Sequence, residues 1–193
     1  RSAELPNHRS PGSRRVLVIG DSVVWGGSQL DQSLIATEMV RRQTGFEVAN
    51  VAASSWGPAN QLAYLRAHGL LEATDVVLVI SSHDAFDVPD FAPISLSPDK
   101  PTHKPWSALQ EGIQRYLLPR IVERSSDDPP MKPDGRSATQ SLAELLSFLS
   151  RSGVRVGVLQ HWEQGEILAD QPYPGHAAIS RVLRDQGIQP VQG

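Results

Sequence analysis

The stretch from Arg15 to Ser22, Arg-Val-Leu-Val-Ile-Gly-Asp-Ser, constrains the fold of this chain more than any other. Its four consecutive apolar residues, 16–19, are too few for a typical helix. Their β-branched side chains and the glycine that follows favour a strand buried on both faces. Open α/β sheets bind ligands at the carboxyl ends of their parallel strands. The pattern therefore places Ser22 where an exposed serine can act as a nucleophile, although a phosphate-binding or purely structural turn would also fit.

Strands and helices alternate along the rest of the chain. The other expected strands cover 46–53, 75–82, 154–159 and 188–191, and the expected helices run from Leu30 to Gly45, from Gly57 to Gly69, over 137–152 and up to Gly187. The helix over 137–152 has leucines at i, i+3, i+4 and i+7, and Ser137 with Gln140 matches a capping box. This alternation predicts one α/β domain with a parallel sheet of about five strands and helices on both faces.

Two segments depart from this alternation. Residues 1–14 are polar, without periodicity, and are predicted to be a flexible tail or linker before the domain of residues 15–193. Residues 85–136 contain nine prolines and form a predicted insertion. Within it, 106–124 is expected to be an amphipathic helix bent at Pro119. An insertion at the ligand edge can be a lid or substrate wall, or only a surface excursion.

Composition excludes several classes of function. The formal charge of −3 lacks the basic excess of nucleic-acid-binding proteins. No apolar run approaches the ~20 residues of a transmembrane helix. The absence of cysteine excludes disulfides and thiolate chemistry. His8, His68 and His103 show no ligand spacing, so neither a metal site nor a cofactor is predicted. The start without Met and the linker-like tail weakly favour a periplasmic or cell-envelope location.

Three motifs follow the first three strands in order. They are Gly20-Asp-Ser-Val-Val-Trp-Gly26, Ala52-Ala-Ser-Ser-Trp-Gly57 and Ser81-Ser-His-Asp84. This ordered set resembles the SGNH, or GDSL, hydrolase family over about residues 15–84. The resemblance implies a flavodoxin-like three-layer α/β/α fold and a serine esterase or acyltransferase.

The resemblance also implies roles for individual residues. Ser22 matches the family's nucleophile, and the N–H groups of Ser22 and Gly57 match its oxyanion donors. The third donor is an asparagine side chain in the family, and His83 stands at that position. A histidine ring N–H can replace the amide, so His83 is either an adapted donor, a sign of altered chemistry, or a histidine packed at a strand end.

The family's catalytic Asp-x-x-His motif is missing from these residues. The nearest sequence is Asp170-Gln-Pro-Tyr-Pro-Gly-His176, which lies one strand too early in the topology. We therefore expect the family's aspartate and histidine to lie beyond residue 193. The alternatives are a relocated base and an inactive relative. For a relocated base, His176 with Asp170 is the candidate pair, and His161 is a further candidate base or substrate contact.

Tryptophans flank the motifs at the ligand edge. Trp25 and Trp56 lie within the first two motifs, and Trp162 follows the fourth strand. Aromatic rings can pack on the apolar faces of sugars, although each ring can equally belong to the core. The sequence thus predicts a serine esterase or O-acetyltransferase acting on O-acetyl groups of a carbohydrate. A non-catalytic carbohydrate-binding relative of the fold is the alternative, and a lipid or thioester hydrolase would need an apolar acyl channel.

Overall fold

A computed structural model describes residues 5–27, 30–89, 105–113, 117 and 138–193. The chain divides into two compact units, Arg1–Pro89 with Arg136–Gly193, and Asp90–Gly135. The first unit carries the α/β fold. In the second, the structure describes helix α4 (Ala108–Gly112), which begins after Ser107. The predicted helix over 106–124 is therefore found at 108–112, and most of its remainder lies outside the described residues.

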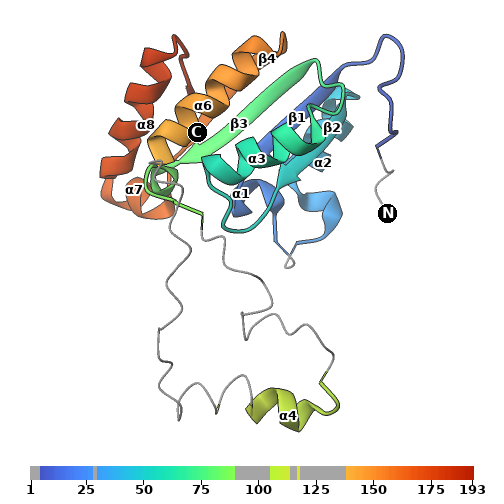
Figure 1. The fold of residues 1–193 in the computed structure, drawn as a ribbon, viewed down its shortest axis with the longest axis vertical. Coiled ribbons are helices and arrows are strands. Elements are labelled where there is room, and N and C mark those ends of the chain that lie inside the picture. The colour runs from blue at the N-terminus through green and yellow to red at the C-terminus, as the bar shows by residue number, and fades with distance from the viewer. Residues whose placement is uncertain (1–4, 28–29, 90–104, 114–116, 118–137) are drawn as a thin grey trace. The chain divides into compact units, whose positions relative to one another are not determined.

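The sheet has five parallel strands in the order β2-β1-β3-β4-β5 (Figure 1). The strands are β1 (Arg15–Gly20), β2 (Glu47–Ala52), β3 (Asp75–Ser81), β4 (Arg155–His161) and β5 (Val191–Gln192). The predicted five-stranded parallel sheet is confirmed. The fifth strand is shorter than the predicted 188–191, and it begins only after Pro190, which has no N–H to donate to a ladder.

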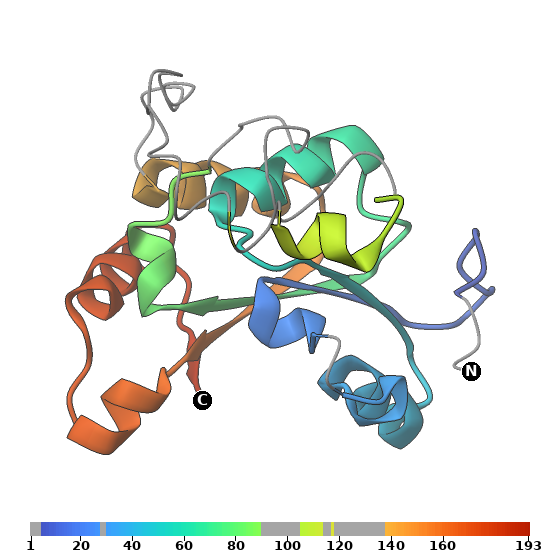
Figure 2. The same ribbon diagram turned by 90° about the horizontal axis from the view of Figure 1, so that it is seen from below.

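Helices lie on both faces of this sheet, as predicted. Figure 2 shows α3 and α6 on one face and α2 on the other. The elements between strands are α1 (Ser22–Trp25), η1 (Gln32–Leu34), α2 (Ala36–Thr44), α3 (Pro58–His68), η2 (Ser82–Ala85), α6 (Ala138–Arg151), α7 (Gln164–Ala169) and α8 (Pro174–Asp185). The single helix predicted from Leu30 to Gly45 is wrong in one respect. Ile35 is extended, with φ −70° and ψ 137°, so the segment forms η1 and then α2.

The core lies between strands β1 to β4 and the helices α3, α6 and α8. β1 and β3 are buried along nearly their whole length, which explains their continuous apolar runs. The predicted leucine stripe of α6 is confirmed, because Leu142, Leu145, Leu146 and Leu149 are all buried in this core. The predicted capping box of this helix involves Ser137, which lies outside the described residues.

Part of the predicted tail is bonded to the domain. The ring of His8 and the backbone N–H of Arg9 both contact the carboxylate of Glu72, at 2.8 and 2.7 Å. The backbone N–H of Ser10 donates to Glu47 Oε1 at 3.0 Å. These contacts lie at the amino ends of the strands, whereas the three motifs follow the carboxyl ends. No helix among the described residues is long and apolar enough to cross a membrane.

Candidate active site

Ser22 is the first residue of α1, directly beyond the carboxyl end of β1, and it is exposed. The turn before it is tight. A Cβ atom on Gly20 would collide with the side chain of Val24, so a glycine is needed there. Asp21 caps the short helix by accepting a hydrogen bond from the N–H of Val23 to Oδ1 at 2.8 Å. The sequence prediction that Ser22 occupies an exposed strand-to-helix turn is therefore confirmed.

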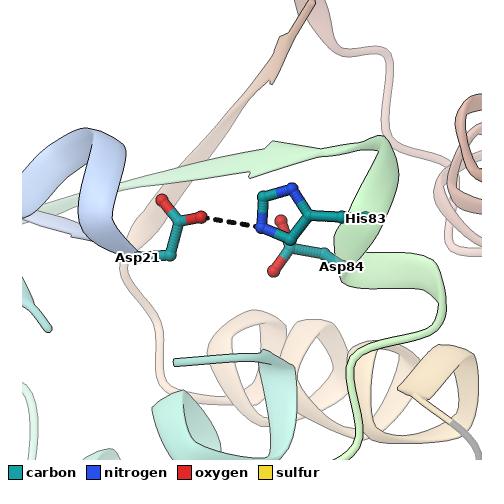
Figure 3. Close-up of side chains that lie close together, drawn as sticks. All are labelled: Asp21, His83 and Asp84. Carbon is teal, nitrogen blue, oxygen red and sulfur yellow. Dashed lines mark hydrogen bonds and ion pairs between the residues drawn. The ribbon is translucent and has the colours of Figure 1, made fainter. Parts of the chain in front are cut away.

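Asp21 also binds the third motif. Its Oδ2 lies 2.9 Å from Nε2 of His83, on the turn that follows β3 (Figure 3). β1 and β3 are neighbours in the sheet, so their ends bring the two residues together although 62 positions separate them. The carboxylate of Asp21 is buried, whereas the imidazole of His83 is half exposed. The predicted oxyanion residue therefore lies at the end of the strand next to that of the predicted nucleophile.

The other ring nitrogen of His83 faces β4. Nδ1 lies 2.9 Å from the hydroxyl of Ser81 and 3.2 Å from Oε1 of Glu163, just beyond β4. The backbone N–H of His83 donates to the same Glu163 oxygen at 3.0 Å. Both ring nitrogens therefore have partners, and the ring lies between two carboxylates.

These carboxylates set the protonation of His83. The hydrogen bond to Asp21, the nearby charge of Asp84 and the hydrogen bond to Glu163 raise the pKa of His83 to about 9, against an opposing effect of burial. Burial alone would raise the pKa of Asp21, but the bonds from His83 and from Val23 lower it below its ordinary value. At neutral pH the pair is thus an imidazolium and a carboxylate, and both ring nitrogens are donors.

Asp84 lies beneath the histidine, in an almost fully buried position. Its Oδ2 accepts a hydrogen bond from the backbone N–H of Ser81 at 2.8 Å. Among the described residues, its buried Oδ1 has no hydrogen-bond partner. Burial raises the pKa of Asp84 to about 7, although the Ser81 bond and the charge of His83 act in the opposite direction. Asp84 thus braces the turn that carries His83.

Asp21, His83 and Asp84 place ligand-type atoms within 4.8 Å of one another, a cluster that the sequence did not predict. Such a cluster shows no regular ligand spacing in the sequence, because Asp21 lies 62 positions before His83 along the chain. Hydrogen bonds already join Asp21 Oδ2 to His83 and Asp84 Oδ2 to Ser81. Asp21 and His83 thus form an ion pair, and Asp84 lies close to it and is hydrogen-bonded to Ser81.

Gly57, the second predicted oxyanion donor, begins α3 beyond the end of β2. A Cβ atom there would lie 3.1 Å from the carbonyl oxygen of Asp87, so the loop after β3 packs closely on this glycine. Its N–H donates to Oδ1 of Asn60 at 3.2 Å. An oxyanion that used this N–H would therefore displace a side-chain cap of the same helix. The assignment of Gly57 stays a prediction.

A buried carboxylate ties the end of β4 to the His83 turn. Glu166, fully buried in α7, accepts from the hydroxyl of Ser82 and from the backbone N–H of Tyr173, both at 2.6 Å. Its other oxygen accepts from the N–H of Glu163 at 2.8 Å. The first turn of α8 also packs closely here, because a Cβ atom on Gly175 would collide with the carbonyl of Ser82. Sequence reasoning missed Glu163 and Glu166, and their only signal was two acidic residues just after the fourth strand.

The histidines proposed as a relocated base lie around β4 and α8. His161 ends β4, half buried, in register with Ser81. His176 lies in the first turn of α8 with its ring edge against Trp162, and Asp170 ends α7 as an exposed residue with φ 48°. No hydrogen bond among the described residues joins His176 to Asp170, and the buried Nδ1 of His176 has no partner there. The roles of all three stay predictions.

The three edge tryptophans have different surroundings. Trp25 is 42% exposed on α1, three residues after Ser22. Trp56 is half buried against the core, with its ring 5.4 Å from that of Tyr64. Nε1 of Trp162 donates to Gln192 at 3.3 Å. Trp25 is therefore the freest of the three to contact a ligand, and Trp56 serves core packing at least in part.

Comparison with known proteins finds similarity in structure only. No known family model matches the sequence, and no curated protein matches it. The psychrotrophic esterase EstA from Pseudoalteromonas sp. matches with a TM-score of 0.50 and 10% identity over 94% of this chain and 78% of that chain. AlinE4, an SGNH-hydrolase family esterase, matches with a TM-score of 0.49 and 14% identity over 93% and 75% of the two chains. Est2A, an acetyl xylan esterase from Butyrivibrio proteoclasticus, matches with a TM-score of 0.45 and 13% identity over 93% and 54%.

These similarities concern the fold. Together with the sheet order, the match to EstA confirms the predicted flavodoxin-like three-layer α/β/α architecture. At these identities the comparison carries no information on substrate, because one fold can support many functions. The chemistry must therefore be argued from the residues of the site.

Proposed function

We propose that this protein is an SGNH-type serine esterase in which Ser22 is the nucleophile. The observation that carries the proposal is the position of this exposed serine at the end of β1, directly after Asp21, whose carboxylate is hydrogen-bonded to a protonated histidine from the end of β3. A serine on a tight turn, next to cationic and N–H donors, is the arrangement that acyl transfer requires.

In this mechanism Ser22 Oγ attacks the carbonyl carbon of the ester and gives up its proton to a base. The N–H groups of Ser22 and Gly57, with the ring of His83, stabilise the resulting oxyanion. Collapse of the tetrahedral intermediate releases the alcohol, which takes a proton, and leaves an acyl-enzyme. Water then releases the acid and restores Ser22. The candidate base is His176, an assignment that rests on the sequence. Its candidate partner Asp170 makes no hydrogen bond with it among the described residues, so orientation of the ring by Asp170 would require a rearrangement.

The substrate class that we favour is an O-acetyl group on a carbohydrate or polysaccharide. The exposed ring of Trp25 near the nucleophile supports this choice, because an exposed aromatic ring can pack on a sugar face. Trp56 and His161 are further candidate substrate contacts. Transfer of the acetyl group to a second carbohydrate would use the same acyl-enzyme, with an alcohol in place of water. A non-catalytic carbohydrate-binding domain is the remaining alternative.

A second candidate substrate has one specific observation in its favour. Val23 and Trp25, on the helix that begins with Ser22, are 48% and 42% exposed and present apolar surface next to the nucleophile. Such a surface could contact a longer acyl chain, as in a lipid or thioester hydrolase. Acyl chain length therefore discriminates the two substrate classes.

The test is turnover by the complete protein of p-nitrophenyl acetate, butyrate and octanoate, with acetate release from an acetylated oligosaccharide measured in parallel. We expect turnover of the acetyl substrates that disappears in Ser22→Ala. A preference for octanoate would favour the lipid hydrolase. If the complete protein turns over none of these substrates and still binds the oligosaccharide, the binding domain replaces the esterase.

A further inference from the structure

One oxygen atom of Glu163 contacts His83 at two points. Glu163 Oε1 accepts from the backbone N–H of His83 at 3.0 Å and lies 3.2 Å from Nδ1 of its ring. The first contact fixes the turn on which the histidine is carried, and the second fixes the ring. A carboxylate on Nδ1 leaves Nε2 as the nitrogen that faces the opposite side. In this structure Nε2 faces the carboxylate of Asp21, the residue that precedes Ser22 in the chain.

Glu163 is itself held from behind. Its backbone N–H donates to Glu166, whose carboxylate is fully buried and accepts from the hydroxyl of Ser82. Ser82 precedes His83 in the chain. The four residues therefore form a closed ring of contacts between the turn after β3 and the start of α7. Glu163 is therefore anchored by hydrogen bonds where it contacts His83.

We propose that Glu163 is a positioning residue of the oxyanion site, which holds the ring of His83 so that its Nε2–H is directed to the carboxyl end of β1. There an oxyanion formed on an acylated Ser22 would compete with Asp21 for this donor. The inference rests on the proposed esterase function and adds to it a residue beyond the fourth strand.

The charges that face His83 make the proposal testable by pH. They are Asp21 from the end of β1, Asp84 from the same turn and Glu163 from the start of α7. Glu163 is one of three groups that raise the pKa of the ring. Removing the charge of Glu163 should lower the pKa of His83. As the pH is raised, the ring would then lose its second proton at a lower pH than in the wild type. A carboxylate that braced the loop without contacting the ring would leave this titration unchanged.

The experiment compares Glu163→Gln and Glu163→Ala with the complete wild-type protein. Gln keeps a carbonyl oxygen for the His83 contacts but removes the charge, and Ala removes both. Asp185→Asn is the matched control, because it removes one carboxylate charge from an exposed position at the end of α8. The measurements are kcat and KM for p-nitrophenyl acetate from pH 6 to 10, and the ring titration of His83 by NMR.

We expect Glu163→Ala to lower kcat by about 10-fold with little change in KM, less than the roughly 10²–10³ that follows complete loss of an oxyanion donor. Glu163→Gln should keep most of kcat near pH 6. As the pH is raised, its activity should begin to fall at a lower pH than that of the wild type, in step with the lower pKa of the His83 ring. Asp185→Asn should match the wild type in both measurements.

Two results would overturn the inference. One is an unchanged His83 titration in Glu163→Gln, which needs no enzymatic activity to observe. The other is a combination of two observations. Glu163→Ala loses kcat because it loses the folded state, as seen by circular dichroism, and Glu163→Gln keeps the wild-type pH profile. Failure of the esterase proposal is a separate outcome, seen as absence of Ser22-dependent turnover in the wild type.

Discussion

A hydrogen bond of 2.9 Å between Asp21 Oδ2 and His83 Nε2 joins the carboxyl ends of β1 and β3. It connects the residue before the proposed nucleophile with His83, which matches the asparagine position of the SGNH family that the sequence resembles. An amide there would be neutral, whereas His83 between carboxylates is a cation at neutral pH. The proposed oxyanion site of this protein therefore carries a charge that an asparagine would not supply.

The role of His83 is tested by two substitutions. His83→Ala removes the donor and should lower kcat by roughly 10²–10³ with little change in KM, because the lost interaction belongs to the transition state. His83→Asn restores a side-chain amide and should retain more activity than His83→Ala. Steady-state kinetics on p-nitrophenyl acetate measure both. Equal activity in His83→Ala and wild type would refute the oxyanion role, and loss of folding would instead support a structural histidine.

The raised pKa of His83 predicts a pH dependence of stability. The pKa is about 9 in the folded protein and near 6.5 in the unfolded chain. The stabilisation by the protonated ring is therefore fully present below about pH 6.5 and is lost as pH rises through about 9. Urea unfolding between pH 6 and 9.5 should show this loss in wild type and not in His83→Asn. Parallel curves for the two proteins would contradict the ion pair.

Asp84 predicts a second pH effect, at lower pH. Its folded pKa of about 7 lies above that of the unfolded chain, so the folded state binds the extra proton between about pH 4 and 7. Stability should therefore fall with rising pH across this window, by up to about 1.4 kcal/mol per pH unit from this group. Asp84→Asn keeps an acceptor for the Ser81 N–H and removes the charge, so this slope should be absent from it. The same slope in both proteins would show that Asp84 is not the group responsible.

The packing of α8 on the His83 turn predicts a site for destabilisation. A Cβ atom on Gly175 would collide with the carbonyl of Ser82, so Gly175→Ala must displace the helix or the turn. Overpacking of this kind typically costs about 1–3 kcal/mol. Gly157→Ala is the control, because among the described residues no atom beyond its chain neighbours lies within 4 Å of the added Cβ. Thermal unfolding should show a lower Tm for Gly175→Ala alone, and equal Tm values would contradict the close packing.

Local patterns in the sequence predicted most of the fold. The buried runs of β1 and β3 and the leucine spacing of α6 are strong because each element faces the core along its length. The short helix α7 was not predicted, since its apolar residues Ile167 and Leu168 are exposed and follow no core-facing period. The break at Ile35 was also missed, because helical spacing continues across it.

Only the residues of the candidate site that belong to the three sequence motifs were predicted. Ser22 and His83 were found because each closely follows a recognisable strand and matches a motif of the resemblance. The contact between His83 and Glu163 joins residues 80 positions apart, and it depends on β3 and β4 being neighbours in the sheet. No pattern in one sequence encodes such a pair. The same holds for the bond between Ser82 and Glu166.

The most direct test of the central claim is covalent labelling of Ser22 in the complete protein. A p-nitrophenyl phosphonate should add one phosphonyl group with release of p-nitrophenol, and peptide mass spectrometry should locate it on Ser22. Ser22→Ala should not be labelled. Wild-type protein that remains unlabelled, or a label on another residue that persists in Ser22→Ala, would contradict the account of Ser22 as the nucleophile.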